Sequence, residues 1–138
     1  MQVIQESSSF ALLRFDQGER FPEAFSEWFG RRQLGAFFYG LGGARRLQVA
    51  WYDLANKTYQ PREFSGQDFE IVSLTGNMAR FNDSPKVHCH ISFSDRTYQT
   101  FGGHLEWLEV GGTLELHVQF MDGLERVQDE ETGLALLN

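Results

Sequence analysis

The sequence predicts an α+β domain built on a mostly antiparallel sheet of about seven strands, with one main N-terminal helix packed on it. Three observations support this prediction. One segment near the N-terminus has aromatic residues at helical spacing, the helical period disappears from Ala36 onward, and short β-branched and aromatic runs then alternate with Gly, Asn and Asp turns. Strands joined by short turns pair in antiparallel fashion. All 138 residues fit one domain, which is long enough to bury a core without disulfides.

The first expected elements are a strand and the helix. An apolar run at residues 10–15 ends at Asp16, Gln17 and Gly18, which predicts a strand followed by a turn. Pro22 then opens the helical segment, which is expected to end near Gly35. Four aromatic residues recur along it at helical spacing: Phe21, Phe25, Trp28 and Phe29. We interpret this stripe as core, because a helix laid on a sheet needs an apolar face.

The remaining strands follow the helix. They are expected at residues 36–41, 47–52, 58–64, 69–75, 87–94, 97–102 and 113–120, with a further extended stretch around 105–109. Alternation assigns two faces in the strand at 87–94, with Val87, Cys89, Ile91 and Phe93 on one side and His88, His90, Ser92 and Ser94 on the other. The histidines therefore leave an apolar face and enter a polar one. Cys89 is expected to be buried and inert.

The polar face of that strand predicts a metal site. His88 and His90 should emerge about 7 Å apart, which suits two ligands of one ion. His104 follows Gly102 and Gly103 on what should be a neighbouring strand, and glycines within a strand indicate a close approach of the backbone. Imidazole suits divalent metals, zinc first among them, and three histidines leave one coordination position open. The competing interpretation is that the histidines lie on a solvent-exposed face and bind no metal.

Carboxylates near this site are candidates for a general base. Glu106 lies on the polar face of the strand that carries His104, and Glu115 and His117 occupy the polar face of the last strand. Glu70 is expected to share a face with Leu74 in a strand that is apolar on both sides, where a carboxylate needs a partner. It would then support a ligand histidine, pair across subunits, or lie at the frayed start of its strand. Glu70 and Glu106 are the catalytic candidates.

Charge and composition narrow the choice of partners. The net charge is −7, and residues 63–138 hold thirteen acidic and four basic groups, so direct nucleic-acid binding is not expected. Cys89 is the only cysteine, and no apolar run approaches the ~20 residues of a membrane span, which predicts a cytoplasmic protein without membrane contact. The chain lacks GxSxG, GxxxxGK[ST] and HExxH motifs, so no standard catalytic signature is present.

Several ordered motifs together resemble the PPC (plants and prokaryotes conserved) domain, also called DUF296. They are residues 69–77 (FEIVSLTGN), the His-Cys-His triplet at 88–90, residues 102–105 (GGHL) and residues 126–134 (RVQDEETGL). The resemblance covers nearly the whole chain, and it implies a compact α+β domain assembled as a homotrimer. It also implies that His88, His90 and His104 correspond to a histidine cluster that is associated with a bound metal in some prokaryotic members.

Two differences from the plant members of this family limit what the resemblance implies. The chain has no AT-hook with its Arg-Gly-Arg core, so minor-groove DNA binding is not implied. Asp68 stands before Phe69 where the partner-contacting motif of the plant domain has an arginine, which reverses the charge at that position. Recruitment of transcription-factor partners through this patch is therefore not expected.

Three functions stay open on the sequence alone. The first is a binding and assembly module, a cytoplasmic homotrimer with a divalent metal held by His88, His90 and His104. The second is a metal-dependent, hydrolase-like enzyme that acts on a small uncharged or cationic molecule. The third is a metal-free trimeric scaffold or regulatory interaction domain, in which the histidines serve subunit packing. The sequence does not decide whether the protein is an enzyme, and it names neither a ligand nor the purpose of the metal.

Overall fold

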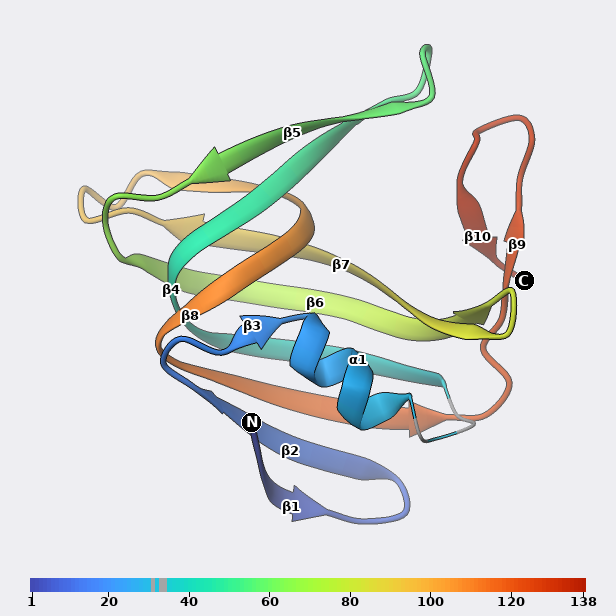
Figure 1. Ribbon diagram of the computed structural model, residues 1–138, viewed down its shortest axis with the longest axis horizontal. Coiled ribbons are helices and arrows are strands. Elements are labelled where there is room, and N and C mark those ends of the chain that lie inside the picture. The colour runs from blue at the N-terminus through green and yellow to red at the C-terminus, as the bar shows by residue number, and fades with distance from the viewer. Residues whose placement is uncertain (31, 33–34) are drawn as a thin grey trace.

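The computed structural model describes residues 1–30, 32 and 35–138 (Figure 1). This part of the chain contains one helix, α1 (Glu23–Phe29), and an eight-stranded sheet. The strands of the sheet are β1 (Gln2–Glu6), β2 (Phe10–Asp16), β3 (Arg20–Phe21), β4 (Gly35–Asp53), β5 (Thr58–Phe64), β6 (Phe69–Phe81), β7 (Ser84–Ser94) and β8 (Thr100–Met121). A separate hairpin pairs β9 (Arg126–Gln128) with β10 (Ala135–Leu137). All of these ladders are antiparallel, as the sequence predicts.

The sheet curls until its middle strands meet. Its strand order is β1-β2-β8-β7-β6-β4-β5, and β8 pairs in addition with β4. The ladders β4–β6, β6–β7, β7–β8 and β8–β4 therefore form a closed circuit. Two long, bent strands make this possible, since β4 has 19 residues and β8 has 22. One consequence is that β7 and the first part of β8 lie side by side, which is where the candidate histidines are found.

Several strands that the sequence predicts as separate are continuous in the structure. The predicted strands 36–41 and 47–52 are both part of β4, and the stretches 105–109 and 113–120 are both part of β8. Glycines lie where the two strands bend and where their pairing shifts register. A Cβ atom on Gly42 (φ +150°) would lie 2.1 Å from the carbonyl oxygen of Thr113, and Gly112 has a φ of +88°. Glycines that suggest turns in the sequence instead allow close backbone contact inside paired strands.

Turn chemistry moves three other strand boundaries. The predicted strand 97–102 begins only at Thr100, because the backbone N–H groups of Thr97 and Gln99 donate to Asp95 Oδ1 at 2.8 and 3.1 Å. β6 and β7 extend beyond the predicted 69–75 and 87–94 and meet in a tight hairpin. Its two turn residues, Asn82 and Asp83, have φ values of 49° and 60°, the left-handed conformation that suits a two-residue hairpin loop.

The helix is shorter than predicted but packs as expected. α1 has seven residues and is followed by Gly30, whereas the sequence predicted an end near Gly35; residues 31, 33 and 34 lie outside the described chain. Figure 1 shows α1 lying against one face of the sheet. Phe25 and Phe29 are buried there, and the ring centroids of Phe25 and Phe38 of β4 are 5.2 Å apart. The aromatic stripe is therefore core, and the helix contributes one short segment rather than a main layer.

Strand alternation separates this core from an outer face, as the sequence predicts. In β7, Cys89, Ile91 and Phe93 are buried, while His90 on the opposite face is exposed. Burial raises the pKa of the Cys89 thiol to about 12, which agrees with an inert side chain.

Among the described residues, no helix is long and apolar enough to cross a membrane.

Candidate metal centre

Three histidines meet where β7 runs beside the first part of β8. His90 and His104 are directly paired across the two strands, and His88 lies two residues before His90 on the same face of β7. The ring centroids are 5.2 to 5.5 Å apart. One ligand nitrogen from each ring lies within 4.8 Å of the other two. The structure thus brings together the three residues that the sequence proposed as one site.

The glycines before His104 allow β8 to approach both of its neighbours. A Cβ atom on Gly102 would lie 2.7 Å from the carbonyl oxygen of Ile91 in β7, and one on Gly103 would lie 3.2 Å from that of Ala50 in β4. A side chain on Gly102 would push β8 away from β7, and one on Gly103 would make a tight contact with β4. The close backbone approach that the glycines predicted is therefore present, and it is what sets His104 beside His90.

Two of the rings are held in their neutral form. The pKa of His88 is lowered to about 4, first by burial and then by the positive charge of Arg126. The pKa of His104 is also lowered to about 4, again mainly by burial. Both imidazoles are therefore uncharged at neutral pH, and each carries the lone pair that metal binding needs.

Arg126 of β9 is the nearest cation to the triad. Its Nη2 group donates to Asn77 Oδ1 at 2.6 Å and lies 3.3 Å from His88 Nδ1, while its Nη1 group donates to the carbonyl oxygen of Ala135 at 2.6 Å. Arg126 is 9% exposed, and burial lowers the pKa of its guanidinium. Since arginine has only donors, His88 Nδ1 must be the acceptor in this contact. Arg126 therefore fixes the tautomer of a candidate ligand.

Tyr59 and Glu106 border the triad on its β8 side. The Tyr59 ring centroid is 4.9 Å from that of His104, and burial raises the pKa of its phenol, with smaller contributions from Tyr52 and Glu106. Glu106 lies two residues after His104 on the same face and accepts a hydrogen bond from Gln48 Nε2. Of the two predicted catalytic carboxylates, Glu106 is the one that lies near the histidines.

The other polar candidates lie elsewhere. Glu70 is exposed at the start of β6, where it pairs with Ser94, four residues along β7 from His90 and hence about 13 Å away. A register shift after Ile71 puts Leu74 on the buried face, so Glu70 does not share a face with Leu74 as the sequence suggested. His117 stacks between Phe10 and Tyr39 with centroid distances of 5.6 and 4.9 Å.

The triad opens into a cavity of about 230 Å³ under the C-terminal hairpin. His88, His104, Arg126, Lys86 and Tyr59 line it, together with residues of β10. The hairpin is fastened to the sheet by hydrogen bonds from the Tyr52 hydroxyl to the carbonyl oxygen of Thr132 (2.8 Å) and from Lys57 Nζ to that of Glu130 (2.6 Å). Figure 1 shows β9 and β10 standing at the end of the sheet.

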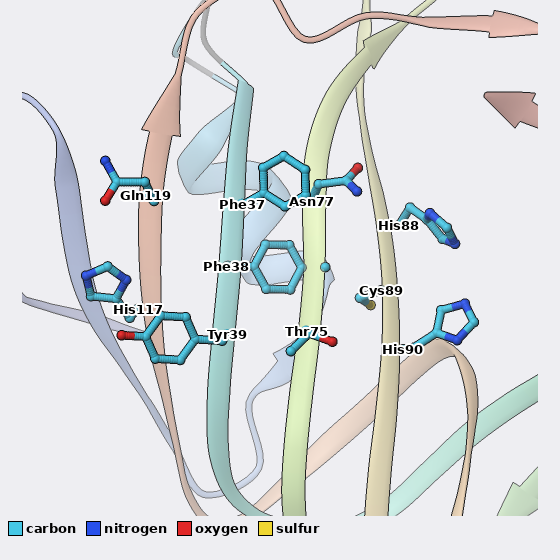
Figure 2. Close-up of a pocket in the computed structure, with 11 residues that line it drawn as sticks. Phe37, Phe38, Tyr39, Thr75, Asn77, His88, Cys89, His90, His117 and Gln119 are labelled. Atoms are coloured by element: carbon cyan, nitrogen blue, oxygen red, sulfur yellow. The ribbon is translucent and has the colours of Figure 1, made fainter. Parts of the chain in front are cut away.

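A broader groove of about 530 Å³ crosses the outer face of β8, β4, β6 and β7 (Figure 2). Strand register arranges its side chains in two rows, which are Gln119, Phe37, Asn77 and His88 in one and His117, Tyr39, Thr75 and His90 in the other. Figure 2 shows His117 at one side of the groove and His88 and His90 at the other. The fourth histidine is therefore separated from the triad by the width of two strands.

The three rings fit a divalent metal. Zinc binds imidazole nitrogen at about 2.0 to 2.1 Å, so two ligands of a tetrahedral ion lie about 3.4 Å apart. Since the ligand nitrogens here lie within 4.8 Å of one another, small side-chain rotations would bring all three onto one ion. A bound zinc would supply a Lewis acid with an open fourth position.

Sequence reasoning missed Arg126, Asn77 and Tyr59. Asn77 and Arg126 both occur in motifs that carried the family resemblance, but no local pattern assigns them to the triad. Their hydrogen bond joins residues 49 positions apart, and the contact of Arg126 with His88 spans 38. Tyr59 reaches His104 only because β5 pairs with the end of β4, which itself borders β8 at Ala50.

Comparisons with known proteins agree with the fold, and one of the similar proteins contains a metal. The sequence profile of the Plants and Prokaryotes Conserved (PCC) domain matches residues 4–121. A metal-containing protein from Archaeoglobus fulgidus is 30% identical, with 100% of this chain and 99% of that chain covered and a TM-score of 0.86. A plant- and prokaryote-conserved protein from Pyrococcus horikoshii is 27% identical (99% and 97% covered, TM-score 0.87). A protein from Ralstonia eutropha that is provisionally named DNA-binding is 26% identical (97% and 94% covered, TM-score 0.89). No curated protein matches the chain significantly.

Proposed function

Because the chain belongs to the Plants and Prokaryotes Conserved domain family, we propose that it is a metal-binding module in which His88, His90 and His104 hold one divalent ion. The observation that carries this proposal is the convergence of three ligand nitrogens within 4.8 Å of one another. Zinc is the first candidate, since it takes imidazole ligands readily. The similarity to a metal-containing archaeal protein over the full chain supports the same assignment.

Metal analysis of protein purified without a histidine tag tests this proposal. Wild-type protein should hold about one metal per chain, and His88→Ala and His104→Ala should lose it. His117→Ala is the matched control, because this histidine stacks on Phe10 and Tyr39 rather than joining the triad. Equal metal content in all four proteins would remove the site and favour a metal-free scaffold.

We propose further that the protein assembles as a homotrimer through the outer face of its sheet. This face is unusually apolar for a surface: Phe37, Tyr39, Leu41 and Val72 are between 43% and 60% exposed. A second copy packed over the groove of Figure 2 would cover these side chains and lie beside His90.

Light scattering coupled to size exclusion measures the assembly directly. We expect a mass of about 48 kDa, three times the 15.9 kDa of one chain, and a shift to smaller species for Tyr39→Glu. Tyr98→Glu is a control, because Tyr98 is 89% exposed in a turn outside this face. A wild-type protein that elutes at the mass of one chain would refute the trimer.

A metal-dependent enzyme that acts on a small molecule is a second candidate, favoured by the cavity next to the triad. In that case Glu106 is the better general base of the two carboxylates, because it lies two residues from His104. Turnover of p-nitrophenyl acetate by the zinc-loaded protein would support this candidate if it fell in both His104→Ala and Glu106→Gln.

A cytoplasmic location also belongs to the proposal, supported by the single, buried thiol of Cys89.

A further inference from the structure

We infer that the cavity beneath the C-terminal hairpin binds a small oxyanion, a carboxylate or a phosphate, with Arg126 and Lys86 as its charged contacts. This inference rests on the proposed metal site, because the same cavity is lined by His88 and His104. The overall charge of −7 favours a cationic ligand, whereas the ligand inferred for this cavity is an anion.

Arg126 is a buried cation without a carboxylate partner in the described residues. It is 9% exposed, and the ion pairs found among these residues leave it out. Its hydrogen bonds go to the amide oxygen of Asn77, the carbonyl oxygen of Ala135 and the ring of His88, all of them uncharged. Its Nε group has no hydrogen-bond partner among them. Burying the guanidinium of Arg126 without a counter-charge costs free energy, and a bound anion would supply that counter-charge.

Lys86 adds a second positive charge to the same cavity. It lines the cavity from β7, two residues before His88, and takes no part in an ion pair among the described residues. Its ammonium group lies 4.8 Å from the centroid of the Phe81 ring, and its side chain lines the same cavity as His88 and His104. Among the described residues, none of those that line the cavity is acidic, and the carboxylate of Glu106 accepts a hydrogen bond from Gln48 Nε2. The cavity is therefore locally cationic.

Metal binding would make Arg126 more available to an anion. A neutral imidazole has a single lone pair, and that of His88 is at Nδ1, where it accepts from Arg126. His88 can accept from Arg126 or bind a metal, but it cannot do both with one lone pair. Loading the triad therefore frees an Nη2 N–H group beside the cavity and adds positive charge there. Metal and anion should each strengthen the binding of the other, because coupling between two sites is reciprocal.

The size of the cavity restricts the ligand. Its volume of about 230 Å³ lies below the ~300 Å³ at which sites for drug-sized molecules begin, so an anion of a few heavy atoms fits best. Arginine presents its N–H groups as a planar fork that matches the two oxygens of a carboxylate or a phosphate. The two anion classes share this chemistry, and their relative affinities distinguish them.

Anion titration of the cobalt-loaded protein tests the inference. Cobalt replaces zinc because its visible spectrum reports changes at the metal, and elemental analysis first establishes the loading. The probes are acetate, inorganic phosphate and the uncharged acetamide at constant ionic strength. We expect saturable spectral changes with acetate or phosphate and none with acetamide. Arg126→Gln should weaken anion binding at least tenfold and Lys86→Gln about threefold, while Arg96→Gln, an equal charge change in an exposed turn, should leave it unchanged.

Calorimetry on the metal-free and loaded proteins separates this inference from the metal site. Stronger anion binding to the loaded form supports the coupling, and the anion should raise metal affinity by the same factor. Normal metal content without anion binding overturns the inference and leaves the metal site standing. Absence of metal in wild type overturns the site, and the metal-free titration then decides the anion pocket alone. Lys86 is exposed, so its variant keeps the test valid if Arg126→Gln fails to fold.

Discussion

Acidifying the metal-loaded protein from pH 7.5 to pH 5 should lower its metal affinity much less than it would lower that of a site of three ordinary histidines. Protons compete with metal for each imidazole, and an ordinary histidine with a pKa of about 6.5 is mostly protonated at pH 5. Three such ligands would together lose about 3 × 10⁴-fold in affinity over this range. In this protein the pKa values of His88 and His104 are lowered to about 4, mainly by burial. Because these two rings stay neutral at pH 5, the loss of metal affinity should fall far short of that figure.

Competition with a chelator of known pH dependence measures this loss. The logarithm of the metal affinity should rise with pH far less steeply than three units per pH unit between pH 5 and 6, since the lowered pKa values of His88 and His104 keep both rings neutral there. His117→Ala should show the same dependence, because its ring lies outside the triad. A slope that approaches three would mean that all three ligands titrate as solvated histidines, and the assigned burial of His88 and His104 would then be wrong.

Three further predictions concern folding and reactivity. Gly102→Ala should destabilise the protein by about 1–3 kcal/mol, because the new Cβ atom would lie 2.7 Å from the carbonyl oxygen of Ile91. Urea denaturation should show this loss as a lower midpoint, and an unchanged midpoint would contradict the close strand approach. The Cys89 thiol, whose pKa burial raises to about 12, should resist thiol reagents at pH 8 until the protein is unfolded, and rapid labelling of native protein would contradict its burial. The metal-free protein should lose stability as the pH falls from about 6.5 to about 4, because the unfolded chain binds protons that His88 and His104, with pKa values lowered to about 4, do not take up when folded. The expected loss is of the order of 1 kcal/mol per ring, since both are partly exposed and solvent screens them, and a flat stability profile over this range would refute it.

Much of the candidate site could be predicted because it depends on local rules. Alternation along one strand is enough to put His88 and His90 on one face and Cys89 on the other. The Gly102–Gly103 pair indicates close backbone contact before any partner strand is known, and the structure places Ile91 and Ala50 at that contact.

The rest of the site depends on strand order and on the C-terminal hairpin. Arg126 reaches His88 because the hairpin folds back over the triad, and Asn77 meets Arg126 because β6 lies beside β7. Glu70 shows the converse case. The sequence left open whether Glu70 has a buried partner or lies at the frayed start of its strand, and the structure shows it exposed at the start of β6, with a register shift after Ile71 that moves Leu74 to the buried face.

The sequence by itself determined the antiparallel class, the aromatic core and the three histidines of the candidate site. The aromatic stripe and the shared face of His88 and His90 follow from periodicity over a few residues, where the covalent chain fixes which side chains share a face. The glycine pair before His104 and the family resemblance added the third histidine. Only the tertiary structure decided that β4 and β8 bend as continuous strands, that His104 pairs directly with His90, and that Arg126 and Lys86 make the adjoining cavity cationic. These features arise from contacts between distant segments, whose free energy depends on how the whole sheet closes rather than on any local pattern.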